Sequence, residues 1–101
     1  MEYIHCMAHY NWSNEKNEKL RAERGVSFEQ VVMQIAAGNL KAVYEHPNKD
    51  KYTNQRILVV EIDRYCYLVP FVEDENGRFL KTIIPSRRAT RMYIGDENEK
   101  E

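Results

Sequence analysis

The chain has 101 residues, of which 43% are hydrophobic and 31% charged, and its net charge at neutral pH is −1. This length suits one domain, and the composition is too apolar for a disordered chain. No apolar run approaches the roughly 18 residues that a membrane-spanning helix needs, so no membrane association is expected.

The charge is uneven along the chain. Residues 96–101 carry a net charge of −3, which leaves +2 on residues 1–95. We expect one domain over 1–95 and a disordered acidic tail over 96–101. This domain is less basic than an ordinary nucleic-acid-binding protein, so contact with nucleic acid would be local. Residues 1–10 lack the apolar stretch of a signal peptide, and a cytoplasmic location is expected.

The first predicted elements are a short strand and a polar helix. Aromatic side chains favour a strand at His9–Trp12. Ser13 or Asn14 can then cap a helix that runs to Glu23. The residues of this helix are mostly charged or amide, so it can bury little beyond Leu20. Such a helix must be held by its neighbours, or it exposes a functional face.

A second helix has the clearest local signal. Ser27 and Gln30 form a capping-box pattern at its start, and Gly38 supplies its end. Between them, apolar residues follow helical spacing, which predicts one stripe packed on a sheet: Phe28, Val31, Val32, Ile35 and Ala36.

Four strands are predicted after the helices, at Leu40–Glu45, Arg56–Ile62, Tyr65–Val72 and Phe79–Ile84. Asp63-Arg64 is short enough to be a hairpin turn. Asn76-Gly77 is typical of a type I′ turn, in which both central residues have positive φ. Pro70 indicates a bulge or an unpaired edge position.

Pro85 and Ser86 should end the last strand, and Arg87–Tyr93 can form a short C-terminal helix. Because short turns join the strands, consecutive strands should pair as an antiparallel meander. The expected class is α+β, with two N-terminal helices packed on a four-stranded antiparallel sheet and a short helix at the C-terminus.

Two blocks of residues resemble one protein family. The first is Trp12-Ser13-Asn14-Glu15-Lys16 followed by Arg24-Gly25-Val26-Ser27-Phe28-Glu29. The second is Ile83-Ile84-Pro85-Ser86-Arg87-Arg88-Ala89-Thr90. In order and spacing they are similar to the opening and closing blocks of the BrnT toxins, which belong to the RelE-like group. Together they bracket residues 12–90.

The resemblance implies a RelE-like fold and the role of toxin in a bacterial type II toxin–antitoxin system. Such a toxin is a metal-independent RNA endonuclease that inhibits translation, and it needs no cofactor. The implied partners are an RNA substrate and a co-encoded antitoxin, commonly a ribbon-helix-helix protein. A dimer or a heterotetramer with that antitoxin fits these expectations.

The chain departs from the family pattern near the end of the first helix. Leu20 stands where the family often has asparagine, Glu23 where it has lysine, and Arg24 where it usually has histidine. An alternative function therefore stays open. In it, the chain is a non-catalytic binding module that engages an antitoxin or a DNA-bound repressor complex.

RNA cleavage without a metal needs three kinds of group. A base takes the proton of the ribose 2′-hydroxyl, an acid protonates the leaving 5′-oxygen, and cations stabilise the charge on phosphorus. Arg87, Arg88 and Arg91 form the densest basic group, and guanidinium matches phosphate oxygens. In a helix Arg87 and Arg91 share a face, while Arg88 points about 100° away. Alternatively, these arginines are solvated or pair with acidic residues.

Tyr93 joins the three arginines as a predicted catalytic residue, because a tyrosine needs cationic neighbours to act as a base. Lys16, Arg24 and Lys81 are the predicted RNA-binding residues. Weaker candidates for proton transfer are Glu45, His46, Glu61 and Tyr67.

Three possible zinc ligands, His5, Cys6 and His9, lie within five residues near the N-terminus. Their spacing matches no common zinc motif and a fourth ligand is not evident, so no metal is predicted. The two cysteines, Cys6 and Cys66, form no disulfide framework and are expected to be free thiols.

One strand carries an aromatic face. In extended backbone, Tyr65, Tyr67, Val69 and Phe71 point the same way. Three interpretations compete: a platform on which RNA bases stack, half of the hydrophobic core, or a surface that an antitoxin covers.

Overall fold

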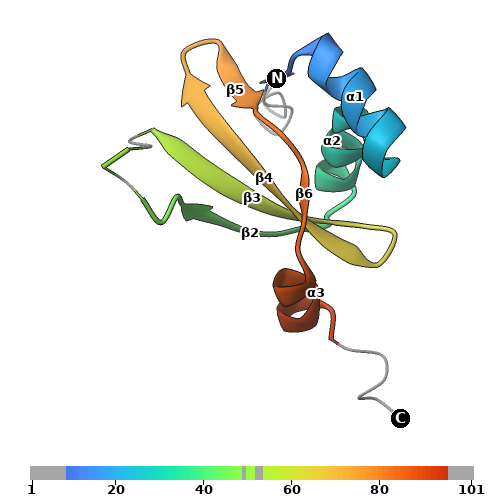
Figure 1. Ribbon diagram of the computed structural model, residues 1–101. Coiled ribbons are helices and arrows are strands. Elements are labelled where there is room, and N and C mark those ends of the chain that lie inside the picture. The colour runs from blue at the N-terminus through green and yellow to red at the C-terminus, as the bar shows by residue number, and fades with distance from the viewer. Residues whose placement is uncertain (1–8, 49, 52–53, 96–101) are drawn as a thin grey trace.

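The computed structural model describes residues 9–48, 50–51 and 54–95. Within them, one six-stranded sheet and three helices form an α+β structure, the class predicted (Figure 1). The helices are α1 (Asn14–Arg24), α2 (Phe28–Ala36) and α3 (Arg87–Tyr93). The strands are β1 (Tyr10–Asn11), β2 (Leu40–Glu45), β3 (Gln55–Ile62), β4 (Tyr65–Asp74), β5 (Gly77–Leu80) and β6 (Ile84–Pro85). No helix of these residues is long and apolar enough to cross a membrane.

The sheet order is β1-β5-β4-β3-β2, and β6 also pairs with β4. Strands β2 to β5 form the predicted antiparallel meander. The prediction of four strands differs from the structure in two respects. The short strand predicted at His9–Trp12 is present as β1, but it joins the edge of the sheet and runs parallel to β5. The last predicted strand is divided, and its second part, β6, pairs with Tyr67 and Leu68 of β4.

Pro70 lies where this last strand is divided. Its carbonyl oxygen accepts a hydrogen bond from the Lys81 N–H at 2.8 Å. Its own nitrogen lies on the same side of the strand and has no hydrogen to donate. The hydrogen-bond ladder is therefore interrupted on this side, between β5 and β6. The predicted bulge or edge position is not what the structure shows, because β4 is an interior strand and Pro70 lies in regular register with Ile57 of β3. The strand does end at Pro85 and Ser86, as predicted, but Pro85 is its last residue and lies opposite Tyr67, one residue beyond the predicted bound.

The turn between β3 and β4 is the predicted one. Asp63 and Arg64 connect the strands directly, because Ile62 pairs with Tyr65. Both turn residues have positive φ, 53° and 66°. Positive φ at both central residues is what a type I′ turn requires, so this turn, and not the next one, has that conformation.

The turn between β4 and β5 lies one residue earlier than predicted. Asp74 pairs with Gly77, so Glu75 and Asn76 form the turn, and neither has positive φ. The Asp74 carboxylate accepts a hydrogen bond from the Asn76 N–H at 2.8 Å, which fixes the earlier start. Gly77 has a φ of +122°, and a Cβ there would lie 2.5 Å from the His9 carbonyl oxygen. Glycine thus permits the approach of β1 to β5.

The sheet separates two clusters of buried side chains. Val59 and Val60 are neighbours on β3 and belong to different clusters, as alternation along a strand requires. Helices α1 and α2 lie together against one face, and α3 lies apart from them (Figure 1). The cluster under α1 and α2 holds the largest buried residues, among them Leu20, Phe28, Val31, Leu58, Val69, Phe71, Leu80 and Ile83. The cluster at α3 consists of Val59, Cys66 and Ala89, with Ala42, Leu68, Tyr93 and Ile94 packed against it.

The polar helix α1 is held by its neighbours, which settles the alternative left open by the sequence. It buries Leu20 and one amide, Asn17. The Asn17 carbonyl oxygen accepts the Phe28 N–H at 2.8 Å, and its NH₂ group donates to Glu29 at 2.8 Å. These bonds fix α1 to the start of α2, where Ser27 and the Gln30 side chain form the predicted capping box. The predicted apolar stripe of α2 packs on the sheet except for one exposed member, Ala36.

Candidate functional site

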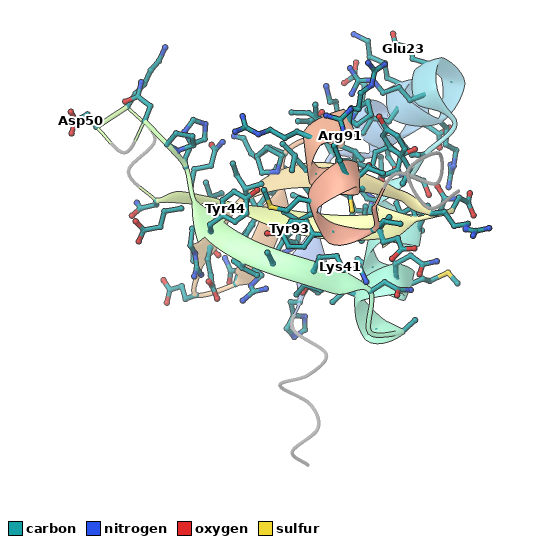
Figure 2. All side chains as sticks on the ribbon, turned by 90° about the horizontal axis from the view of Figure 1, so that it is seen from below. Glu23, Lys41, Tyr44, Asp50, Arg91 and Tyr93 are labelled. Atoms are coloured by element: carbon teal, nitrogen blue, oxygen red, sulfur yellow. The ribbon has the colours of Figure 1, made fainter. Side chains whose placement is uncertain are left out.

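A cavity of about 280 Å³ lies between the sheet and helix α3. The sheet contributes Tyr44 from β2 and Leu68 from β4, and the helix with its cap contributes Ser86, Arg88, Ala89, Met92 and Tyr93. Figure 2 shows Tyr44 of β2 beside Tyr93 of α3. Two of the four residues predicted to be catalytic, Arg88 and Tyr93, therefore meet in one cavity.

Hydrogen bonds fix helix α3 in this position although it has only seven residues. The Ser86 hydroxyl accepts the Ala89 N–H at 3.0 Å and caps the helix. The Thr90 hydroxyl donates to the Ser86 carbonyl oxygen at 2.8 Å and accepts the Cys66 N–H of β4 at 2.8 Å. With Ala89 buried against the sheet, the helix cannot rotate freely, and Arg88 is kept at the cavity.

The three arginines of α3 do not converge on one point. All are exposed, but only Arg88 lines the cavity. Arg87 and Arg91 lie one turn apart, and Figure 2 shows Arg91 projecting from a different side of α3 than Tyr93. Within the described part of the chain, no ion pair engages any of these guanidinium groups. Three cations on one short helix are thus available to an external anion.

The three predicted RNA-binding residues lie outside this cavity. Arg24 donates a hydrogen bond from Nη1 to the Ile83 carbonyl oxygen, so it ties α1 to the segment before β6. Lys81 is exposed just after β5. Lys16 is on α1, at a separate hollow of about 220 Å³ that it lines with Ser13, Glu15 and Lys19.

None of the four weaker proton-transfer candidates lines the cavity. Tyr67 packs against the core under α1 and α2, and burial raises the pKa of its phenol, which makes it a poorer base near neutral pH. Glu61 pairs with Lys41 at 3.1 Å. The Nδ1 atom of His46 accepts a backbone N–H in its own loop at 3.1 Å. Glu45 is exposed at the end of β2.

The aromatic face of β4 belongs to the core, which was one of its three predicted interpretations. Val69 and Phe71 are fully buried, and Tyr67 packs against their cluster. Tyr65 contacts the Tyr67 ring edge-on, with 5.6 Å between ring centroids. This face does not present a platform for RNA bases.

The exposed tyrosine at the cavity, Tyr44, was missed by the sequence argument. It follows Ala42 at a spacing of two on β2, and Ala42 packs against the α3 cluster. Alternation along the strand therefore places Tyr44 on the same face. This signal was available once β2 was predicted, but nothing in the sequence showed that α3 would lie opposite.

Of the three possible zinc ligands the structure describes only His9, and of the two cysteines only Cys66. His5 and Cys6 lie outside the described residues, as does the acidic segment 96–101. Among the residues that are described, no group of three or more His, Cys, Asp or Glu side chains could hold a metal ion. Cys66 is a buried free thiol, and burial raises its pKa, which disfavours the reactive thiolate.

Comparison of the chain with protein-family models, with curated proteins and with solved structures finds no match.

Proposed function

We propose that the chain is a metal-independent RNA endonuclease, the toxin of a type II toxin–antitoxin system, with its active site in the cavity at α3. The observation that carries the proposal is the meeting of a guanidinium group and two phenol groups in one cavity, from Arg88, Tyr44 and Tyr93. The two sequence blocks that resemble BrnT toxins support the same function, and the second of them contains Arg88. A RelE-like fold and a ribbon-helix-helix antitoxin as partner belong to this proposal.

The proposed reaction uses the RNA's own 2′-hydroxyl as the nucleophile. Its oxygen attacks the adjacent phosphorus and its proton passes to solvent water, while the bond from phosphorus to the 5′-oxygen breaks. Arg88 stabilises the extra negative charge on the phosphoryl oxygens. Tyr93 donates its phenolic proton to the leaving 5′-oxygen and regains a proton from water. The products are a 2′,3′-cyclic phosphate and a 5′-hydroxyl.

The other two arginines of α3 have a supporting role in this proposal. Arg87 and Arg91 are exposed and lie on the same short helix as Arg88. We infer that they neutralise neighbouring phosphates of the same strand. Local binding of this kind does not require a basic protein, so it agrees with the net charge of −1.

A second candidate function is favoured by one observation. Among the residues that the structure describes, those that line the cavity include no histidine, aspartate or glutamate, the types whose unperturbed pKa values lie closest to neutrality or below it. A site without such a base suits a non-catalytic module that binds RNA or an antitoxin through the same surface.

Incubation of the purified full chain with single-stranded RNA in the presence of EDTA tests the proposal. We expect cleavage that leaves 2′,3′-cyclic phosphate ends. Arg88→Ala should lower the cleavage rate by about 100-fold or more, as loss of one transition-state donor commonly does. Arg87→Ala is the matched variant, an adjacent exposed arginine outside the cavity, and should lower the rate less than tenfold. In cells, induced synthesis of the wild-type chain should arrest growth, and Arg88→Ala should relieve the arrest.

The outcomes separate the two candidate functions. RNA that stays intact with the wild-type chain, or cleavage that EDTA abolishes, removes the metal-independent nuclease and leaves the binding module. Equal loss of activity in the two arginine variants removes the assignment of the active site to this cavity. Because both arginines are exposed, the thermal stability of each variant should match that of the wild type, which guards against misfolding as the cause.

A further inference from the structure

We propose that the cavity at α3 is a subsite for one nucleobase of an unpaired nucleotide, with the base stacked on the rings of Tyr44 and Tyr93. The inference rests on the proposed function in taking RNA as the ligand, and it goes further in naming single-stranded RNA as the form that is bound. It assigns to Tyr44 a role in substrate binding.

The size of the cavity limits its occupant. Its volume of about 280 Å³ is at the lower end of the roughly 300–1,000 Å³ that small-molecule sites occupy. One nucleobase fits such a space, and the sugar and phosphate of the same nucleotide then lie at its edge, where Arg88 is exposed. The volume therefore suits an occupant of about the size of one base.

The lining of the cavity is suited to a flat aromatic ring. Its lining includes two tyrosines, Tyr44 and Tyr93, and two side chains that are mainly apolar, Leu68 and Met92. Tyr44 is 44% exposed and Met92 66% exposed, so this apolar surface is open to solvent. Stacking on aromatic rings accepts any of the four bases, because every base has a π face.

The charge beside the cavity identifies the base as part of a nucleotide. Arg88 lines the cavity and is itself exposed, and Arg87 and Arg91 lie close by on the same helix. An apolar side chain of a partner protein would fill the cavity but leave these three cations without a counter-charge. A nucleotide supplies the ring for the cavity and the phosphate for Arg88.

An unpaired nucleotide is required by the geometry of stacking. Inside a duplex, each base is covered on both faces by its neighbours and cannot enter a cavity without unstacking. In a single strand the base can turn out of the chain and stack on protein side chains. The subsite therefore selects loops, ends and other unpaired RNA.

The structure offers a matched control for Tyr44. Phe79 is 39% exposed and pairs with Val72 of β4. Val72 lies four residues after Leu68 on that strand. Alternation places Phe79 on the α3 side of the sheet, but it does not line the cavity. A general effect of exposed aromatic rings on RNA binding would therefore appear at Phe79 as well as at Tyr44.

Fluorescence anisotropy with the full chain and a mixed-sequence RNA oligomer tests the subsite. Every 2′-hydroxyl of the oligomer carries a methyl group, so it binds but cannot be cleaved. We expect Tyr44→Ala to raise Kd by about tenfold or more, Tyr44→Phe to keep the wild-type Kd, and Phe79→Ala to leave it unchanged. The same oligomer in a duplex should bind much more weakly than the single strand.

A second substitution in the cavity tests the subsite without relying on the folding of the Tyr44→Ala variant. Met92→Asp, at a side chain that is 66% exposed, places a negative charge in the cavity and should also raise Kd. Thermal unfolding followed by circular dichroism shows that each variant is folded. An unchanged Kd in both Tyr44→Ala and Met92→Asp overturns the subsite, and so does an equal loss in Phe79→Ala or equal affinity for the duplex.

The cleavage and binding measurements together distinguish failure of the nuclease proposal from failure of the base subsite. A wild-type chain that leaves ordinary RNA intact but binds the methylated single strand through Tyr44 has lost the catalytic function and kept the base subsite. A chain that cleaves RNA while Tyr44→Ala and Phe79→Ala behave alike has kept the catalytic function and lost the subsite.

Discussion

The two faces of the sheet differ in how completely they are covered. Among the residues that the structure describes, eleven buried side chains form one continuous cluster under α1 and α2. At α3, the buried cluster has three residues, and a cavity of about 280 Å³ opens beside them. Burial of apolar area is the main source of stability, whereas a ligand must reach its site through solvent. The contrast indicates that one face holds the fold together and the other is accessible for binding.

The sequences of the covering helices account for this difference. Helix α2 places apolar residues at helical spacing and turns Phe28 and Val31 into the sheet. Helix α3 has one buried residue, Ala89, and much of its remaining surface consists of arginine side chains. A small side chain lets the helix approach the sheet but contributes little apolar area.

The largest loss of stability should come from a substitution in the cluster under α1 and α2. Phe28→Ala removes a fully buried ring that stacks on Trp12 with 5.6 Å between centroids. We expect a loss of about 3–5 kcal/mol in the free energy of unfolding, a large part of the roughly 5–15 kcal/mol typical of a domain. Urea unfolding measures the loss. Phe79→Ala, at a ring that is 39% exposed, should change the same quantity by less than about 1 kcal/mol.

A smaller loss of stability is expected from shortening either of two neighbouring valines of β3, which are buried on opposite faces of the sheet. Val59 and Val60 are adjacent on β3 and both are fully buried, but they face opposite clusters. Val60→Ala should cost about 2–3 kcal/mol in unfolding free energy, because the large cluster cannot close around the cavity that is left. Val59→Ala should cost about 1–2 kcal/mol, since the half-exposed neighbours at α3 can shift. Equal costs, or a larger cost at Val59, would show that the α3 face is packed as rigidly as the other.

The smallest effect concerns acid pH at the α1–α2 contact. The hydrogen bond from Asn17 holds the pKa of Glu29 below its ordinary value of 4.5. A lowered pKa in the folded state means that Glu29 stabilises the protein above pH 4.5 and that this contribution disappears as the pH falls through the folded value. The carboxylate is half exposed, so solvent screens the effect.

Melting temperatures at about pH 6 and about pH 3 check this expectation. Glu29→Gln should be less stable than the wild type at the higher pH, and the difference should narrow at the lower pH. A constant difference between the two proteins across this range would contradict the assignment.

Several elements could be predicted because the information is local. The bounds of β2 and α3 and the capping box of α2 match the prediction, since caps and alternating side chains involve residues a few positions apart. The β4–β5 turn was placed one residue late because the Asp74 carboxylate competes for the Asn76 N–H. Strand β1 could be foreseen as a strand, but its parallel pairing with β5 depends on a contact far along the chain.

The candidate site was predictable only in part. Helical periodicity showed that Arg88 points away from Arg87 and Arg91, but it could not show which side would meet a cavity. Tyr44 has no local feature that marks it as a site residue, because it is one tyrosine near the end of an edge strand. Lys16 and Arg24 were grouped with the arginines by charge, and the structure places them at α1, outside the cavity.

The sequence by itself determined the α+β class, the order of the main elements and the helical phase of the α3 arginines. The tertiary structure alone decided that α3 covers the face opposite α1 and α2, and that Tyr44 and Tyr93 line one cavity although about half the chain separates them. The physical reason is the separation along the chain over which each interaction acts. Hydrogen bonds of caps and turns join near neighbours, whereas the meeting of two surfaces depends on how distant segments pack.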